Sequence, residues 1–290
     1  MVSIKAKLAI NIIFLALSLM GSMTVSAMGS TISDDEPRGQ PKAVVILLHG
    51  LNLKPSKMDD WSAALKNRGA HVIRFALYGH AGVDEHMKTV NADIWRQEFV
   101  NLVEVAKRKA KELDDVPLYF LGFSLGALVA LEWSANNSSG DKFEKMVLIA
   151  PAISLSSFYR SLVDGASWLL GDNMVVPSRS PEEYRANVKG TSVAAYRALF
   201  ALTDLLETKN YQGTNVDTLV LIDQNDELVS SDRVREVIKQ FKLSKWKLEI
   251  VDNRFAYDNY GFRHLMVDQQ ATGETLWKDL SDKVTAHFGL

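Results

Sequence analysis

The sequence predicts an α/β fold with a doubly wound, mostly parallel sheet of about six strands. Short runs of Val, Ile and Leu recur along the chain without polar alternation, which is typical of parallel strands covered on both faces. Segments with helical periodicity separate these runs, so strand and helix alternate. The length of 290 residues suits one large sheet of this kind.

The predicted strands and helices alternate along the chain, with one long interval that interrupts the alternation. Strands are predicted at 43–48, 71–75, 118–121, 146–149, 219–222 and 247–251, and helices at 59–67, 92–111, 125–136, 231–241 and 273–288. About 65 residues separate Ile153 from Leu219, far more than a crossover connection needs. We therefore expect a helical cap inserted at about 154–216, with helical material at 193–206.

The N-terminal segment predicts export. Residues 1–27 carry Lys5 and Lys7 near the start, continue with the apolar run 8–20 and end in the small-residue pattern VSA, as a signal peptide does. Cleavage would leave a bacterial periplasmic or secreted protein without a stable membrane anchor. The alternative is an uncleaved anchor, because an apolar stretch reaching Ala27 could just span a bilayer.

Residues 28–42 are polar and contain two prolines, so they predict a linker before a single domain at 43–290. Only about 15 residues lie between the predicted cleavage site and the first predicted strand, too few for two further strands and a linker. This shortage is the reason to expect about six strands.

Composition excludes several classes of site. Without the two lysines of the signal peptide, 31 basic residues face 35 acidic ones, a net charge of −4 without long blocks of one sign, so no nucleic-acid partner is predicted. The chain has no cysteine, which excludes disulfides, a zinc–thiolate site and a thiol nucleophile.

The segment GFSLG places Ser124 between two glycines, at the junction of a predicted buried strand and a predicted helix. On so tight a turn, side chains at Gly122 and Gly126 would collide with neighbouring backbone. The turn lifts the hydroxyl out of the sheet to the start of a helix, where free N–H groups favour developing negative charge. Ser124 is therefore the candidate nucleophile.

In this context the sequence resembles the α/β-hydrolase family, and its monoacylglycerol-lipase and serine-aminopeptidase branch in particular. The resemblance implies that LLHGLN forms the oxyanion loop, with the Leu51 and Leu125 amides as donors and His49 as a support of the loop. It also implies that LIDQNDELVS carries the triad acid, Asp226, and that YGFRHLMVD carries the base, His264.

Chain order supports these assignments, because the family runs from serine through the acid to histidine. Only His264 and His287 follow Asp226, and His287 is expected to be a solvated residue of the terminal helix. Asp223 is the alternative acid, and Asp226 is favoured because Asp223 stands where the family usually has a small residue.

The resemblance implies a serine hydrolase that needs no cofactor or metal and cleaves small or lipid-like carboxylic esters through an acyl-enzyme. Apolar and aromatic residues in the insertion favour a small-molecule ester with a medium or long acyl chain. A peptidase, thioesterase or acyltransferase could use the same triad. A catalytically silent binding protein on a hydrolase scaffold is the alternative from another class.

Overall fold

The computed structural model describes residues 32–137, 140, 142–153, 171 and 174–290. The chain divides into two units, Met1–Ser30 and Thr31–Leu290, and the described residues belong to the second. The predicted signal peptide lies outside them, as do residues 154–170 and 172–173 of the predicted cap. Within the described ranges, no helix has both the length and the apolar character needed to cross a bilayer.

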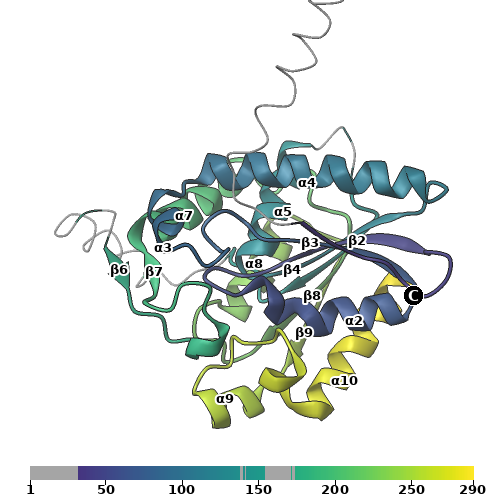
Figure 1. Cartoon of the computed structure of the whole chain (residues 1–290). Helices are drawn as coiled ribbons and strands as arrows, with labels where there is room; N and C mark the ends of the chain where they lie inside the picture. Colours follow the sequence, from purple (N-terminus) through teal and green to yellow (C-terminus); the bar gives the residue numbers. More distant parts are fainter. Residues whose placement is uncertain (1–31, 138–139, 141, 154–170, 172–173) are drawn as a thin grey trace, which may run out of the picture. The chain divides into compact units, whose positions relative to one another are not determined.

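A seven-stranded sheet with the strand order β1-β3-β2-β4-β5-β8-β9 forms the centre of the second unit (Figure 1). Its strands are β1 (Ile32–Asp35), β2 (Ala43–Leu48), β3 (Ala70–Phe75), β4 (Leu118–Phe123), β5 (Lys145–Ile149), β8 (Asp217–Asp223) and β9 (Trp246–Val251). All neighbouring pairs are parallel except β1 with β3. The predicted fold class is confirmed, with all six predicted strands in place.

The seventh strand, β1, lies within the segment 28–42 that the sequence predicts as a linker, so the sheet has one strand more than the approximate number expected. Its side chains bind the rest of the fold through charge: Asp35 lies 2.7 Å from Arg74 Nε, and Asp34 contacts His71. The Ser62 hydroxyl also donates to Asp35, at 2.7 Å. Ladder hydrogen bonds and ion pairs thus hold an acidic edge strand that strand propensity disfavours.

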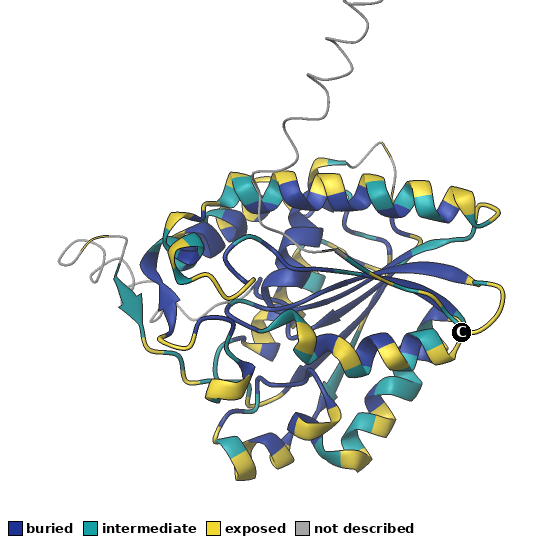
Figure 2. Cartoon of the chain, viewed as in Figure 1, coloured by how far each residue is buried: buried dark blue, intermediate teal, exposed yellow. Residues whose placement is uncertain are grey.

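Helices cover both faces of the sheet. One face carries α4 (Ala92–Glu112), α5 (Leu125–Asn136), α7 (Val193–Thr208) and α8 (Ser231–Gln240), and the other carries α2 (Asp59–Asn67) and α10 (Gln269–Phe288). Alternate residues of β2 enter the two cores, and all six are buried (Figure 2). This two-sided burial explains why the strands lack polar alternation.

Three helices differ from the prediction. Helix α10 begins at Gln269, four residues early, because the Asp268 side chain accepts a hydrogen bond from the Ala271 amide at 2.7 Å. Gly273, the predicted start, instead interrupts the helical geometry with φ 73° and ψ 161°. The short helices α3 (Asp84–Thr89) and α9 (Arg254–Tyr260) were not predicted, because so few residues carry little periodicity.

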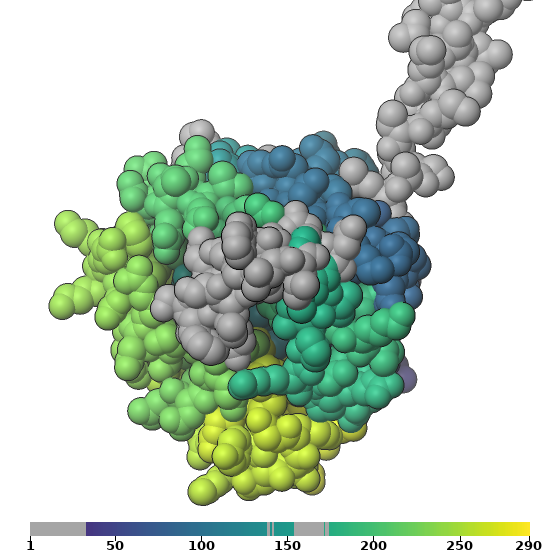
Figure 3. Space-filling model, turned by 90° about the vertical axis from the view of Figure 1, so that its left-hand side faces the viewer, coloured from purple at the N-terminus to yellow at the C-terminus, as the bar shows by residue number. Residues whose placement is uncertain are grey.

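The described part of the insertion contains a two-stranded sheet, β6 (Val175–Val176) with β7 (Thr191–Ser192), a 3₁₀ turn η2 (Glu182–Tyr184) and α7. Another 3₁₀ turn, η1 (Pro55–Met58), follows β2. Figure 3 looks onto this side, where the described part of the insertion (green) lies between the α3–α4 region (blue) and the C-terminal segment (yellow). The predicted helix at 193–206 is therefore present as α7.

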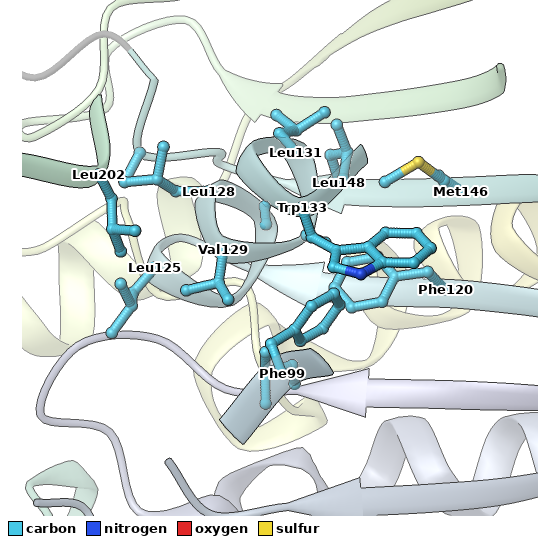
Figure 4. Packing of buried hydrophobic residues seen from close by; sticks show 14 of the residues in the cluster. Phe99, Phe120, Leu125, Leu128, Val129, Leu131, Trp133, Met146, Leu148 and Leu202 are labelled. Atoms are coloured by element: carbon cyan, nitrogen blue, oxygen red, sulfur yellow. The ribbon is translucent and has the colours of Figure 1, made fainter. Parts of the chain in front are cut away.

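Helix α5 has no solvent-facing side, and eleven of its twelve residues are buried. It lies among the sheet, α4 and α7, where apolar side chains meet it from all three (Figure 4). The Phe99 ring of α4 meets Phe120 of β4 edge-on, with centroids 5.8 Å apart, and Trp133 of α5 at 6.0 Å. Because this packing fixes α5, it also fixes the residue that precedes it, Ser124.

Candidate active site

Ser124 lies between β4 and α5 in a strained backbone conformation, with φ 50° and ψ −109°. Such dihedrals cost a non-glycine residue about 1–3 kcal/mol and persist only where the surroundings impose them. Here the Ser124 amide donates to the Ile149 carbonyl at 2.9 Å, and its carbonyl accepts from Leu128 and Ala152 at 3.2 Å each. The residue therefore occupies the sharp strand-to-helix turn that its sequence context predicts.

The flanking glycines are required by close backbone approach. A Cβ atom on Gly122 would lie 2.8 Å from the Ala127 nitrogen, and one on Gly126 would lie 2.7 Å from the Leu48 carbonyl oxygen. Both distances to backbone atoms are shorter than normal nonbonded contacts, and at Gly122 the Phe120 ring lies closer still, at 2.5 Å. The predicted collision is confirmed for both positions.

His264 and Asp226 lie together at the same edge of the sheet. His264 Nδ1 is 2.6 Å from Asp226 Oδ2, and the other oxygen of Asp226 accepts from the amides of Leu228 and Val229 at 2.8 and 2.9 Å. Both side chains are buried. This contact favours the tautomer in which Nδ1 carries the proton and Nε2 is free to accept one.

Asp223, the alternative acid, has different partners. Its carboxylate accepts from the amides of Asn225 at 2.6 Å and Asn253 at 2.5 Å, and it lies 3.4 Å from Arg263 Nη1. The structure thus pairs Asp226 with His264 and gives Asp223 contacts with the loop that carries His264.

Two residues that the sequence analysis did not single out hold this loop by its backbone. The carboxylate of Glu227 accepts from the amides of Arg263 and His264 at 3.0 and 3.2 Å. From the other side, the Asn253 side chain donates to the carbonyls of Arg263 and Leu265 at 3.1 and 2.6 Å. Only their places in the sequence could have indicated this role, since Glu227 follows Asp226 and Asn253 closely follows β9.

The two predicted oxyanion donors occupy neighbouring loops. Leu51 follows β2 and Leu125 opens α5 after β4, and the two strands pair in parallel with Leu48 beside Gly122. Among the described residues, neither amide donates a hydrogen bond to another group of the protein. Both N–H groups are therefore available to a ligand.

Two buried histidines hold the Leu51 loop as hydrogen-bond acceptors. His49 Nε2 accepts from the Leu77 amide at 3.1 Å, and its Nδ1 lies 2.8 Å from the Gly50 carbonyl. His80 Nε2 accepts from the Asn52 amide at 2.9 Å. Burial lowers the pKa of His49 to about 4, and burial together with the nearby His49 lowers the pKa of His80 well below its usual value. Both rings are therefore neutral at pH 7, as acceptors must be.

The same loop is hydrogen-bonded to the insertion. Asn52, in the left-handed region at φ 51°, accepts from the Asn187 amide at 2.8 Å and donates to the Asn187 carbonyl at 3.2 Å. The Ala186 amide adds a bond to the Asn52 carbonyl at 3.0 Å. The base of the insertion and the oxyanion loop consequently form one hydrogen-bonded unit.

A cavity of about 370 Å³ lies between the sheet edge and the insertion. Ser124, His264 and Leu51 line it together with apolar residues of the insertion, namely Met174, Val176, Tyr196, Leu199 and Phe200. Tyr184, another aromatic residue of the insertion, is fully buried instead and donates to Asp268 at 2.9 Å. Within the described part of the chain, no group of His, Asp or Glu side chains is arranged to hold a metal ion.

His287 lies away from this cavity. Lys145, the first residue of β5, donates to its carbonyl at 2.7 Å, which places it at the opposite edge of the sheet from Ser124. Its side chain is half-buried rather than solvated, and burial lowers its pKa. The expectation of a solvated residue is wrong, because the terminal helix packs His287 against the strand ends.

Comparison with known proteins decides the family. Residues 39–255 match the family described as serine aminopeptidase, S33. The chain belongs to this family. The matched range contains Ser124 and Asp226 and ends before His264.

Curated relatives and solved structures are also similar to the chain. It is 26% identical over 139 residues to phospholipase YtpA of Bacillus subtilis, covering 48% of this chain and 51% of the relative. It is 29% identical over 119 residues to monoglyceride lipase of Rattus norvegicus, covering 41% and 38%. The match thus spans about half, or less, of each relative.

Solved structures extend the likeness to the whole fold. A soluble variant of monoglyceride lipase from Saccharomyces cerevisiae has a TM-score of 0.72 at 12% identity, covering 89% of this chain and 92% of that one. Monoacylglycerol lipase of Paleococcus ferrophilus has a TM-score of 0.64 at 16% identity, covering 90% and 100%. At these identities the likeness establishes the α/β-hydrolase fold.

Because His49 and His80 are neutral in the folded protein, we expect the free energy of unfolding to decrease in acid. Because the pKa of His49 is about 4 in the folded chain against 6.5 as the ordinary value, the unfolded chain binds a proton first. The free energy of unfolding should therefore decrease from about pH 6.5 towards pH 4, by up to roughly 1.4 kcal/mol per pH unit for each such histidine. Urea denaturation across this range measures the slope.

The variant His49→Gln should flatten the slope, whereas His86→Gln, which changes a histidine outside the buried pair, should leave it unchanged. An identical slope in His49→Gln and wild-type protein would contradict the assignment.

Proposed function

We propose that this protein is a serine hydrolase that cleaves carboxylic esters. The observation that carries the proposal is a single cavity lined by Ser124, on its strained turn, and by His264, whose Nδ1 lies 2.6 Å from Asp226. The N–H groups of Leu51 and Leu125, which have no acceptor among the described residues, add donors for a developing negative charge. Membership of a hydrolase family supports the same conclusion.

In the proposed mechanism, His264 Nε2 takes the proton of the Ser124 hydroxyl as its oxygen attacks the ester carbonyl. Asp226 holds the ring and stabilises the imidazolium, while the Leu51 and Leu125 amides bind the oxyanion. The tetrahedral intermediate collapses, the alcohol leaves with the proton from His264, and the acyl group remains on Ser124. Water, deprotonated by His264, then attacks the carbonyl of the acyl-enzyme. The bond between the acyl group and Ser124 Oγ breaks, His264 returns the proton to Oγ, and the carboxylic acid is released.

We further propose that the acyl group is of medium or long chain length. The described insertion contributes chiefly apolar side chains to the cavity. Each buried methylene would contribute about 0.8 kcal/mol to binding. The relatives named monoglyceride lipase and phospholipase support esters of this type.

A peptidase is the alternative that the family description raises. An aminopeptidase must recognise the positively charged amino group of its substrate, for which a carboxylate is the natural partner. Among the described residues that line the cavity, none is Asp or Glu. The cavity therefore favours an ester over a peptide with a free amino end.

Replacement of the nucleophile tests the reaction class. Ser124→Ala should lower ester turnover by a factor of about 10⁴ or more, because the acyl-enzyme can no longer form. A fluorophosphonate probe should label wild-type protein and not Ser124→Ala, with circular dichroism as the control for folding. Comparable turnover in folded mutant protein would contradict the mechanism, and a wild-type protein that resists the probe would favour a catalytically silent binding protein.

The two aspartates form a matched pair for testing the acid. Asp226→Asn should cost far more activity than Asp223→Asn, since a loss of about 10⁴ follows when the histidine tautomer is wrong. Asp223→Asn should act mainly on stability, because Asp223 contacts the histidine loop and not the ring. Purified mutants are compared by kcat/KM and by urea denaturation, and the reverse order in kcat/KM would assign the role to Asp223.

The chain-length proposal predicts that kcat/KM on p-nitrophenyl esters rises from acetate to medium or long acyl chains. Leu199→Trp, which fills part of the cavity, should move the optimum to shorter chains. Leu205→Trp on the same helix is the control, because Leu205 does not line the cavity. A steady decline from acetate onward in wild-type protein would indicate a short-acyl esterase instead.

A further inference from the structure

Three consecutive polar residues of the insertion, Ser178, Arg179 and Ser180, line the same cavity as Ser124 and His264. Arg179 is the one described lining residue with a permanent charge. Arg179 is solvent-exposed, and within the described part of the chain no carboxylate pairs with it. A cation that forms no ion pair with the described residues, beside an otherwise largely apolar wall, is a candidate contact for an anionic ligand group.

Another arginine holds this segment in place. Arg185 donates from Nε to the Ser180 carbonyl at 2.6 Å, from Nη2 to the Ser178 carbonyl at 3.0 Å and from Nη1 to the Val188 carbonyl at 3.2 Å. The backbone is therefore fixed on both sides of Arg179. These three partners of the Arg185 guanidinium are neutral carbonyls, so its positive charge adds to that of Arg179 next to the cavity.

The serines add neutral donors. The Ser180 amide donates to the Ser178 hydroxyl oxygen at 3.2 Å, which leaves the hydroxyl hydrogen of Ser178 free to donate in turn. A guanidinium between two hydroxyls matches a group with several acceptor oxygens, because arginine binds phosphate through two parallel hydrogen bonds.

The apolar residues that line the rest of the cavity indicate which part of the substrate carries the negative charge. Met174, Val176, Leu199 and Phe200 are apolar, and burying a charge against them would be costly. The acyl chain suits this apolar part, so the charge belongs to the alcohol side of the ester.

We propose that Arg179, with Ser178 and Ser180, binds a phosphate group on the leaving alcohol, so that the preferred substrates are single-chain esters of phosphate-bearing alcohols. This inference rests on the proposed function and names the substrate class of that same site.

Matched substrates test it on the full chain: 1-dodecanoyl glycerol and 1-dodecanoyl glycerol 3-phosphate share one acyl chain and differ in the phosphate. Arg179→Gln should lower kcat/KM for the phosphate ester roughly 10- to 100-fold, the range of a hydrogen bond to a charged group, and change that for the neutral ester less than about twofold. Arg179→Lys should restore part of the loss. Lys189→Gln, which removes an exposed cation of the same insertion that does not line the cavity, should change neither.

A binding measurement separates this inference from the proposed function. Calorimetry with dodecyl phosphate on Ser124→Ala protein needs no turnover, and Arg179→Gln in that background should weaken binding at least tenfold. Inorganic phosphate should not displace dodecyl phosphate from the site. Displacement at equal concentration would show that the site binds a free anion instead.

An equal loss on both substrates, or unchanged binding of dodecyl phosphate in Arg179→Gln, would overturn the role of Arg179. A different result would separate the two proposals. If wild-type protein hydrolyses no ester but dodecyl phosphate still binds in a way that depends on Arg179, the proposed function is wrong and the anion-binding role of Arg179 is retained.

Discussion

The burial of helix α5 on every side is the constraint on which the site depends. Strain at Ser124 costs free energy, and it persists because α5 cannot move away from β4 without opening the apolar core around Trp133 and Phe99. The approach of Gly126 to the Leu48 carbonyl brings the start of α5 onto the end of β2. One packing arrangement therefore positions both the serine and the loop that carries Leu51.

Around that helix, the site is assembled from loops that follow the carboxyl ends of parallel strands, where open α/β sheets commonly bind ligands. The loops are held mainly by buried polar contacts with their backbone. Neutral His49 and His80 accept amide hydrogens on one side, and Glu227 and Asn253 hold the His264 loop on the other. Such contacts keep loop atoms in place without placing further charges in the cavity.

The insertion contributes to the site in two ways, through hydrogen bonds to the oxyanion loop and through side chains that line the cavity. Asn187 ties its base to the oxyanion loop through Asn52, while its apolar and polar side chains form a wall of the cavity opposite the sheet edge. A change in the position of the insertion would therefore alter both the space for an acyl chain and the backbone beside Leu51. In the proposed enzyme, substrate recognition and oxyanion binding share one hydrogen-bonded structure.

The sequence by itself determined the fold class, the parallel strands and the strand-to-helix turn at Ser124. These follow from local properties: continuous apolar runs, helical periodicity and two glycines at positions where a Cβ atom has no space. It could not determine β1, because an acidic edge strand is stabilised by Arg74 and His71, which lie far along the chain. The family resemblance already favoured Asp226 over Asp223, and the structure places Asp226 against His264, whereas the roles of Asn52, Glu227 and Asn253 were decided by tertiary structure alone. Both aspartates stand close together in the sequence after the same strand, and only the folded position of a loop about forty residues later determines which carboxylate meets the imidazole.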